Sequence, residues 1–189
     1  MLDERVVRSS AVTNVLLVVA GSAIIAIAAQ IAINVPFSPV PLTMQPIAVL
    51  LVGVVLGSKR GAAAATLYLL EGMSGMPVFA QMHGGAAWLV GPTAGYLWSY
   101  PFAAFVAGWF SEKNWGSTLV RAVAGMLVAL AVIYLGGWSW LAVLTGARNA
   151  FVAGVAPFVV ADIVKVAIAA TLLPYAQRIG AGFSRHNAG

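Results

Sequence analysis

The sequence predicts an all-α membrane protein in which six helices form a bundle and both chain termini lie in the cytoplasm. Only 8% of the 189 residues are charged and 61% are hydrophobic, whereas soluble domains carry about 25% charged residues. The apolar residues gather in six segments that approach the length of a membrane span. The basic residues gather in alternate loops between these segments. A water-soluble fold is therefore close to excluded.

Each of the six predicted helices rests on an apolar run. The first run begins at Ala11 and exceeds the apolar core of a signal peptide, which is about 7–15 residues, so it is predicted to be retained. The second and third runs are short and are expected to depend on packing against neighbouring helices. Pro157 suits the first turn of the last helix, where its missing N–H costs nothing. The predicted helices, within a single domain of residues 1–189, are about 11–33, 42–57, 60–72, 92–110, 117–136 and 157–177.

The connections between these helices differ in character. The segment 34–46 contains four prolines and is expected to be stiff and largely extended, although the prolines alone fit a rigid turn joining two helices. The stretch 72–96 is too long for a plain connection and is rich in glycine, apolar and aromatic residues. It is therefore expected to fold as an outer cap, about residues 72–91, over a pocket. Part of 136–156 is a candidate for a short interfacial helix.

The distribution of basic residues predicts the orientation. With the N-terminus in the cytoplasm, Arg148 is the one basic residue in an outer loop and Lys165 lies within a helix. The other eight basic residues fall on the cytoplasmic side, as the positive-inside rule requires. The net charge of +5 is thereby explained by topology, and no nucleic-acid partner is needed. The eight residues are Arg5, Arg8, Lys59, Arg60, Lys113, Arg121, Arg178 and Arg185.

Two opposite charges, Asp162 and Lys165, lie inside the last apolar run. Spaced i and i+3, they share one helix face, roughly 8–12 Å below the outer helix end at 1.5 Å per residue. Ionisable groups at that depth are costly and usually face a bundle interior or a water-filled cavity. One interpretation is a salt bridge that fixes helix packing. The other is a site for a ligand that presents an N–H donor beside a carbonyl or carboxylate.

Enzymatic classes find little support in the sequence. There is no cysteine, and the acidic residues form no cluster with metal-ligand spacing. No serine stands in a G-x-S-x-G string and no GxxxxGK[ST] loop is present to bind a nucleotide. We therefore predict no catalytic residue, no metal and no cofactor. Glu71 is expected to be structural, and Arg148 either steers an anionic ligand or is a solvated interfacial charge.

Several strings of the sequence together resemble one family. They are PFSPVPLTMQ, LLVGVVLGSKRGAAAATLYLLEGMSGMPVFA, GPTAGYLWSYP and APFVVADIVKVAIA, and they cover about half of the chain, residues 34–105 and 154–170. They resemble the BioY family, the biotin-binding S components of energy-coupling-factor (ECF) vitamin transporters. The resemblance implies a six-helix S component in the plasma membrane that binds biotin with high affinity from outside. It also implies a transmembrane coupling subunit and two ATPases as partners.

The resemblance also assigns candidate ligand residues. The family's DxxK motif falls on Asp162, which can accept from a ureido N–H of biotin, and Lys165, which can donate to the ureido oxygen or to the carboxylate. The other candidates are the polar Gln45 and Thr43, the aromatic Phe37, Trp88 and Tyr96, and the lone outer His83. Two alternatives stay open. One is a biotin carrier that acts alone or as a homo-oligomer, and the other is a proton-coupled carrier whose relay is the Asp162–Lys165 pair.

Overall fold

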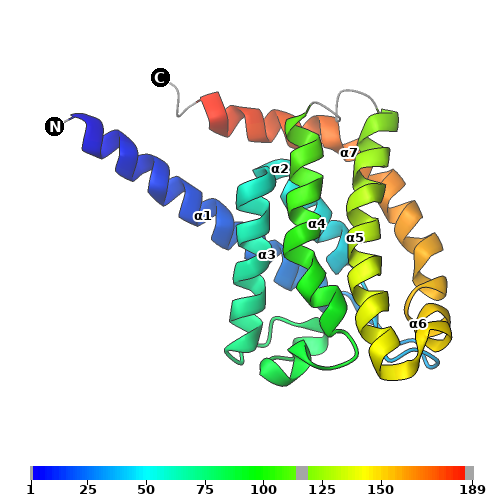
Figure 1. Cartoon of the computed structure of the whole chain (residues 1–189). Helices are drawn as coiled ribbons and strands as arrows, with labels where there is room; N and C mark the ends of the chain where they lie inside the picture. Colours follow the sequence, from blue (N-terminus) through cyan, green and yellow to red (C-terminus); the bar gives the residue numbers. More distant parts are fainter. Residues whose placement is uncertain (1, 114–118, 186–189) are drawn as a thin grey trace.

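A computed structural model describes residues 2–113 and 119–185, and its fold is all-α (Figure 1). These residues form seven α-helices, two short 3-10 helices and one two-stranded antiparallel ribbon. The α-helices are α1 Leu2–Gln30, α2 Gln45–Leu56, α3 Ser58–Met73, α4 Ala94–Glu112, α5 Leu119–Thr145, α6 Ala147–Gly154 and α7 Ala156–Arg185. The shorter elements are β1 Ala32–Ile33, β2 Leu42–Thr43, η1 Ala80–Met82 and η2 Ala86–Leu89.

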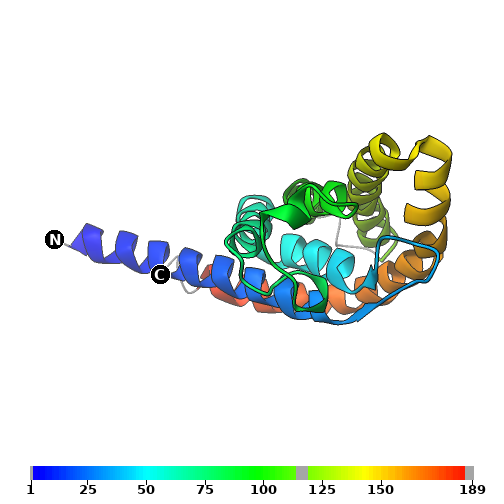
Figure 2. The same cartoon turned by 90° about the horizontal axis from the view of Figure 1, so that it is seen from below.

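Helix α4 occupies the centre of the bundle, where it packs against α2, α3 and α5. Helix α7 packs against α2 and α5, and α1 packs against α2 and α3. The connections that carry η1, η2 and α6 gather at one end of the bundle, shown at the bottom of Figure 1. Figure 2, seen from below, shows the loop of residues 31–44 running from α1 toward α7 before it returns to α2. This end of the bundle holds the site described below.

Among the described residues, two helices have the length and composition needed to cross a membrane, or three if a bent pair of helices counts as one span. Ala11–Gln30 of α1 and Val120–Thr145 of α5 qualify by themselves. Helix α6 with the first part of α7 passes as a pair bent by 43°, which is the geometry of a broken span or of a re-entrant loop. Helix α1 leans away from the bundle along much of its length (Figure 1). Within Ala11–Gln30 many side chains are exposed, although Ile25 and Ala29 are fully buried. These long apolar helices fit a membrane protein.

The turn between α2 and α3 is packed backbone to backbone. A Cβ atom added to Gly53 would lie 2.3 Å from the carbonyl oxygen of Ala104, so α2 and α4 touch at their main chains. Gly57, at a φ of +85°, makes the turn itself. Glu112 of α4 then accepts hydrogen bonds from the backbone N–H of Ser58 at 2.7 Å and from its hydroxyl at 2.9 Å. A carboxylate from one helix thus caps the first turn of another.

The fifth helix continues beyond the predicted end at residue 136. The glycine pair Gly136 and Gly137 stands at the predicted end, but α5 runs through both to Thr145. A Cβ at Gly137 would lie 2.1 Å from the Tyr96 ring, and one at Gly136 would lie 2.8 Å from Cβ of Ser99. The pair therefore serves close packing against α4 and not helix termination. The short helix expected within 136–156 is present as α6, and Pro157 lies in the first turn of α7 as predicted.

Candidate ligand-binding site

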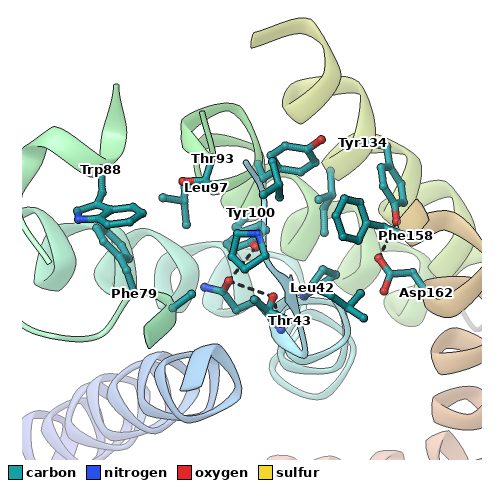
Figure 3. A pocket seen from close by; sticks show the side chains of 17 residues that line it. Leu42, Thr43, Phe79, Trp88, Thr93, Leu97, Tyr100, Tyr134, Phe158 and Asp162 are labelled. Carbon is teal, nitrogen blue, oxygen red and sulfur yellow. Dashed lines mark hydrogen bonds between the residues drawn. The ribbon is translucent and has the colours of Figure 1, made fainter. Parts of the chain in front are cut away.

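A pocket of about 650 Å³, open mouth included, lies where α4, α5 and α7 meet the loops of the lower end (Figure 3). Most of its lining is apolar or aromatic, with polar side chains at a few points. The lining residues are Val40, Pro41, Leu42, Thr43, Gln45, Pro46, Phe79, Ala80, Trp88, Thr93, Tyr96, Leu97, Tyr100, Ile133, Tyr134, Phe158 and Asp162.

The proline-rich loop forms one wall of the pocket and has a fixed shape. Strands β1 and β2 pair with Ala32 opposite Thr43, which brings the chain back toward α2. The hydroxyl of Ser38 donates to the carbonyl oxygen of Ala153 in α6 at 2.7 Å. The loop is therefore held at both its base and its tip, and it presents residues 40–43 to the pocket.

The cap loop, residues 74–93, forms a second wall. The Phe79 ring is 2% exposed and meets the Tyr68 ring edge-on, with centroids 5.5 Å apart. A Cβ at Gly72 would lie 2.1 Å from the Phe79 ring, so this glycine makes room for it. Trp88 lines the pocket, and the His83 ring, which is outside the lining, lies against the Trp88 ring with centroids 4.3 Å apart. The stretch is thus folded and contributes to the pocket wall.

At one edge of the pocket, Asp162 is 5% exposed and both of its carboxylate oxygens accept hydrogen bonds. Lys165 donates to Oδ1 at 2.8 Å, and the Tyr134 hydroxyl donates to Oδ2 at 2.7 Å. Lys165 also donates to the carbonyl oxygen of Thr43 at 3.0 Å. The i, i+3 spacing therefore does place the two charges on one face. These contacts join α5, α7 and the loop before α2.

A second polar group lies deeper, near the start of α2. The Thr43 hydroxyl donates to Oε1 of Gln45 at 3.1 Å, and the Tyr100 hydroxyl approaches the same oxygen at 3.5 Å. The amide nitrogen of Gln45 donates to the Tyr68 hydroxyl. No buried side-chain nitrogen or oxygen of the described residues lacks a partner. The polar atoms are therefore oriented before any ligand enters.

The structure brings most of the sequence-predicted site residues to this pocket. Five of the eight form part of its lining, and they are Thr43, Gln45, Trp88, Tyr96 and Asp162. Lys165 reaches the pocket through Asp162, and His83 stands behind Trp88. Phe37 is 68% exposed and outside the lining, because the tip of its loop turns toward α6. Arg148 is exposed on α6 and also lies outside the lining.

Sequence reasoning missed four aromatic residues of the lining, which are Phe79, Tyr100, Tyr134 and Phe158. Tyr134 could have been identified from the sequence, because a tyrosine in the middle of an apolar helix needs a hydrogen-bond partner for its hydroxyl. Glu71, expected to be structural, accepts a hydrogen bond from Ser22 of α1 and lies outside the lining.

The pocket is suited to noncovalent binding of a partly polar small molecule. Asp162 is the one charged residue among the described residues of the lining, and Lys165 balances its charge. Within residues 2–113 and 119–185, no three His, Cys, Asp or Glu side chains are placed to hold a metal ion. Aromatic walls with a few oriented donors and acceptors are typical of such sites.

Comparison with known proteins gives consistent matches along most of the chain. Residues 4–181 match the BioY family. A probable biotin transporter of Pyrococcus horikoshii is 44% identical over 157 residues, covering 83% of this chain and 90% of the relative. A biotin transporter of Thermotoga maritima is 41% identical over 144 residues, covering 74% and 82%. The crystal structure of an S-component for biotin from an ECF-type ABC transporter has the same fold, with a TM-score of 0.80, 22% identity and coverage of 90% and 92%.

Proposed function

Since this chain belongs to the BioY family, we propose that it binds biotin with high affinity and serves in biotin uptake as the substrate-specific subunit of an ECF-type transporter. Both relatives described above are named as biotin transporters, and they are similar to this chain over most of their length. The structure with the same fold is an S-component for biotin. The proposed activity is binding and transport, with no catalytic step.

The observation that carries this proposal is the hydrogen-bonded group of Asp162, Lys165 and Tyr134 at the edge of an aromatic pocket. Biotin has two ureido N–H donors beside one carbonyl acceptor. Asp162 accepts from a ureido N–H, and Lys165 donates to the ureido oxygen or to the carboxylate. Thr43 and Gln45 supply further polar contacts, while Trp88 and Tyr96 pack against the apolar parts of the ligand.

For the membrane we propose a six-span arrangement in the plasma membrane, with both termini in the cytoplasm. In this arrangement α1 to α5 each make one span, and α6 with α7 makes the sixth. The basic residues Lys59, Arg60 and Lys113 then lie on the cytoplasmic side, as the positive-inside rule favours. The pocket and its loops face outward, where the vitamin is encountered.

The energy for transport is proposed to come from a transmembrane coupling subunit with two ATPases. The exposed apolar side chains of α1 offer a surface for such a partner, and they include Val12, Val15, Leu16, Val19, Ile24 and Ile27. Exposed apolar side chains on a helix can also face lipid. Uptake measurements therefore test whether transport needs a coupling subunit. Uptake at background level in cells that lack every coupling subunit supports the partnership, and full uptake there contradicts it.

The test of the proposed ligand is biotin binding to the purified protein in detergent, with thiamine and riboflavin as competitors. Tight binding that neither competitor displaces is the expected result. It should need no proton gradient, which separates a binding subunit from a proton-coupled carrier. A well-folded sample that binds no biotin contradicts the proposal.

A further inference from the structure

The side-chain amide of Gln30, the last residue of α1, is bonded to the cap loop at three points. Its nitrogen donates to the carbonyl oxygens of Val78 at 3.3 Å and Phe79 at 3.2 Å, and its oxygen accepts from the N–H of Met82 at 2.9 Å. The same nitrogen donates to the carbonyl oxygen of Ala26, one turn earlier in α1, at 3.0 Å. One side chain thus fastens the backbone of the cap loop to the end of a helix.

The part of the cap loop that Gln30 holds has an unfavourable backbone conformation. Gln81 and Met82 both have positive φ values, 61° and 60°, in the left-handed region. Side chains other than glycine rarely adopt this region, because Cβ approaches the carbonyl oxygen. Both side chains are exposed, so burial does not explain the conformation. The Met82 N–H donates to Gln30, a residue outside the loop, and this hydrogen bond stabilises the left-handed conformation.

This conformation decides where a wall of the pocket stands. Phe79 and Ala80 line the pocket directly before the two left-handed residues, and Phe79 is also one of the residues that Gln30 contacts. The turn is closed by a hydrogen bond from the Phe79 N–H to the His83 carbonyl oxygen at 2.9 Å. Gln30 itself is outside the lining. Its influence on a ligand must therefore pass through the cap loop.

We propose that Gln30 is a positioning residue, which holds Phe79 and the cap loop against the pocket and thereby slows the escape of the bound ligand. This inference rests on the proposed biotin binding. A ligand enclosed by the cap loop leaves only when the loop moves. Without Gln30, the two left-handed residues relax toward ordinary backbone conformations and carry Phe79 with them.

The experiment measures the dissociation rate of radiolabelled biotin from the purified protein in detergent. We expect Gln30→Ala to speed dissociation by about tenfold, the effect of removing one or two neutral hydrogen bonds. The matched control is Asn149→Ala. Asn149 is an exposed amide that donates to the carbonyl oxygen of Thr145 four residues earlier at 3.0 Å, as Gln30 does to Ala26. Asn149 lies on α6, and among the described residues it has no hydrogen bond to the cap loop. Its dissociation rate is expected to match that of the wild type.

A rescue experiment separates positioning from general loss of structure. Glycine adopts positive φ readily, so adding Gln81→Gly and Met82→Gly to Gln30→Ala should recover about a third or more of the lost residence time. A variant that is merely misfolded would show no such recovery. If Gln30→Ala cannot be purified, Gln30→Glu takes its place, because it keeps the acceptor for the Met82 N–H and loses the amide donors.

The outcomes distinguish this inference from the proposed function. Wild-type protein that binds no biotin overturns both. Wild-type protein that binds biotin, with Gln30→Ala releasing it at the wild-type rate, overturns the role of Gln30 alone. Faster release that the glycine substitutions leave uncorrected also overturns positioning through the left-handed turn. Faster release with recovery on glycine substitution, and no change in Asn149→Ala, supports it.

Discussion

The carboxylates of Glu112 and Asp162 both tie separate helices together, but their donors are of different kinds. Glu112, at the end of α4 far from the pocket, accepts from the backbone N–H and the hydroxyl of Ser58. Asp162, at the pocket, accepts from the side chains of Tyr134 and Lys165. A backbone N–H at a helix start cannot turn away, whereas a hydroxyl or an ammonium group can be redirected to a ligand. Glu112 is therefore part of the fixed architecture, whereas the donors that contact Asp162 can be redirected to a ligand.

The surroundings of Glu112 and Asp162 also differ. Near Glu112, glycines bring main chains together, and a Cβ at Gly108 would lie 2.4 Å from the Ser58 nitrogen. Near Asp162, aromatic rings such as Tyr134 and Phe158 enclose an open pocket. Close main-chain packing resists rearrangement. Glu112 therefore lies among closely packed main chains, whereas Asp162 lies at the edge of a pocket where a ligand can be admitted.

The largest effect is expected from removing the charges at the pocket. Asp162→Asn or Lys165→Ala should leave a folded protein whose biotin Kd is weakened by about 10- to 150-fold, since one hydrogen bond to a charged group contributes about 1.5–3 kcal/mol. Titration of purified protein with biotin measures the change. The matched control is Glu112→Gln, a change in the other carboxylate, which should leave Kd unaltered. Equal Kd values for wild type and Asp162→Asn would contradict the assignment.

The converse change, Glu112→Ala, should act on stability and not on binding. It leaves the Ser58 N–H without its partner, and we expect the free energy of unfolding to fall by about 1–3 kcal/mol. For a chain of this size that corresponds to a lower unfolding temperature by roughly 2–4 °C per kcal/mol. Thermal unfolding in detergent checks this. A loss of biotin affinity comparable to that of Asp162→Asn would erase the distinction between the two ends.

A smaller effect on binding is expected from Tyr134→Phe. The substitution removes one hydroxyl donor to Asp162, so the carboxylate is less well oriented and Kd should weaken by about 3- to 10-fold. Combining it with Asp162→Asn tests whether the two residues act together. We expect the double variant to bind about as poorly as Asp162→Asn alone, because residues of one hydrogen-bonded group are not additive. Strictly additive effects would mean that Tyr134 acts on the ligand independently of Asp162.

The smallest effect is expected from Phe37→Ala. The ring is exposed and outside the pocket lining, and surface substitutions of this kind change free energies by about 0.5 kcal/mol or less. The biotin Kd should therefore change by about twofold or less. The same titration measures it. A tenfold loss would show that the proline-rich loop folds inward onto the ligand.

The helices and one part of the site were predictable because short-range rules govern them. Apolar runs indicate where helices lie, although only two or three of the described helices have membrane length. The i, i+3 spacing alone places Asp162 beside Lys165. The end of α5 was wrong by nine residues, from 136 to Thr145, because a glycine pair has the same sequence pattern whether it ends a helix or admits a neighbour.

The aromatic lining depends on long-range packing, which the sequence does not express. Tyr100 and Tyr134 reach the pocket because of how α4 and α5 are rotated against each other, and an apolar helix gives little sign of which face points inward. Phe37 and Phe79 both lie in loops beside prolines, yet only Phe79 is buried. The difference arises from the space left by Gly72 and from contacts that join residues far apart in the chain.

The pocket between α4, α5, α7 and the loops also has a consequence for folding. A protein interior is normally packed to the density of an organic crystal, and here the bundle leaves a pocket between its helices and loops. A bound vitamin would act as the missing core of that half of the molecule. At a concentration 100 times its Kd it would raise the free energy of unfolding by about 2.7 kcal/mol. The transported vitamin would then also serve as a chemical chaperone for its own carrier.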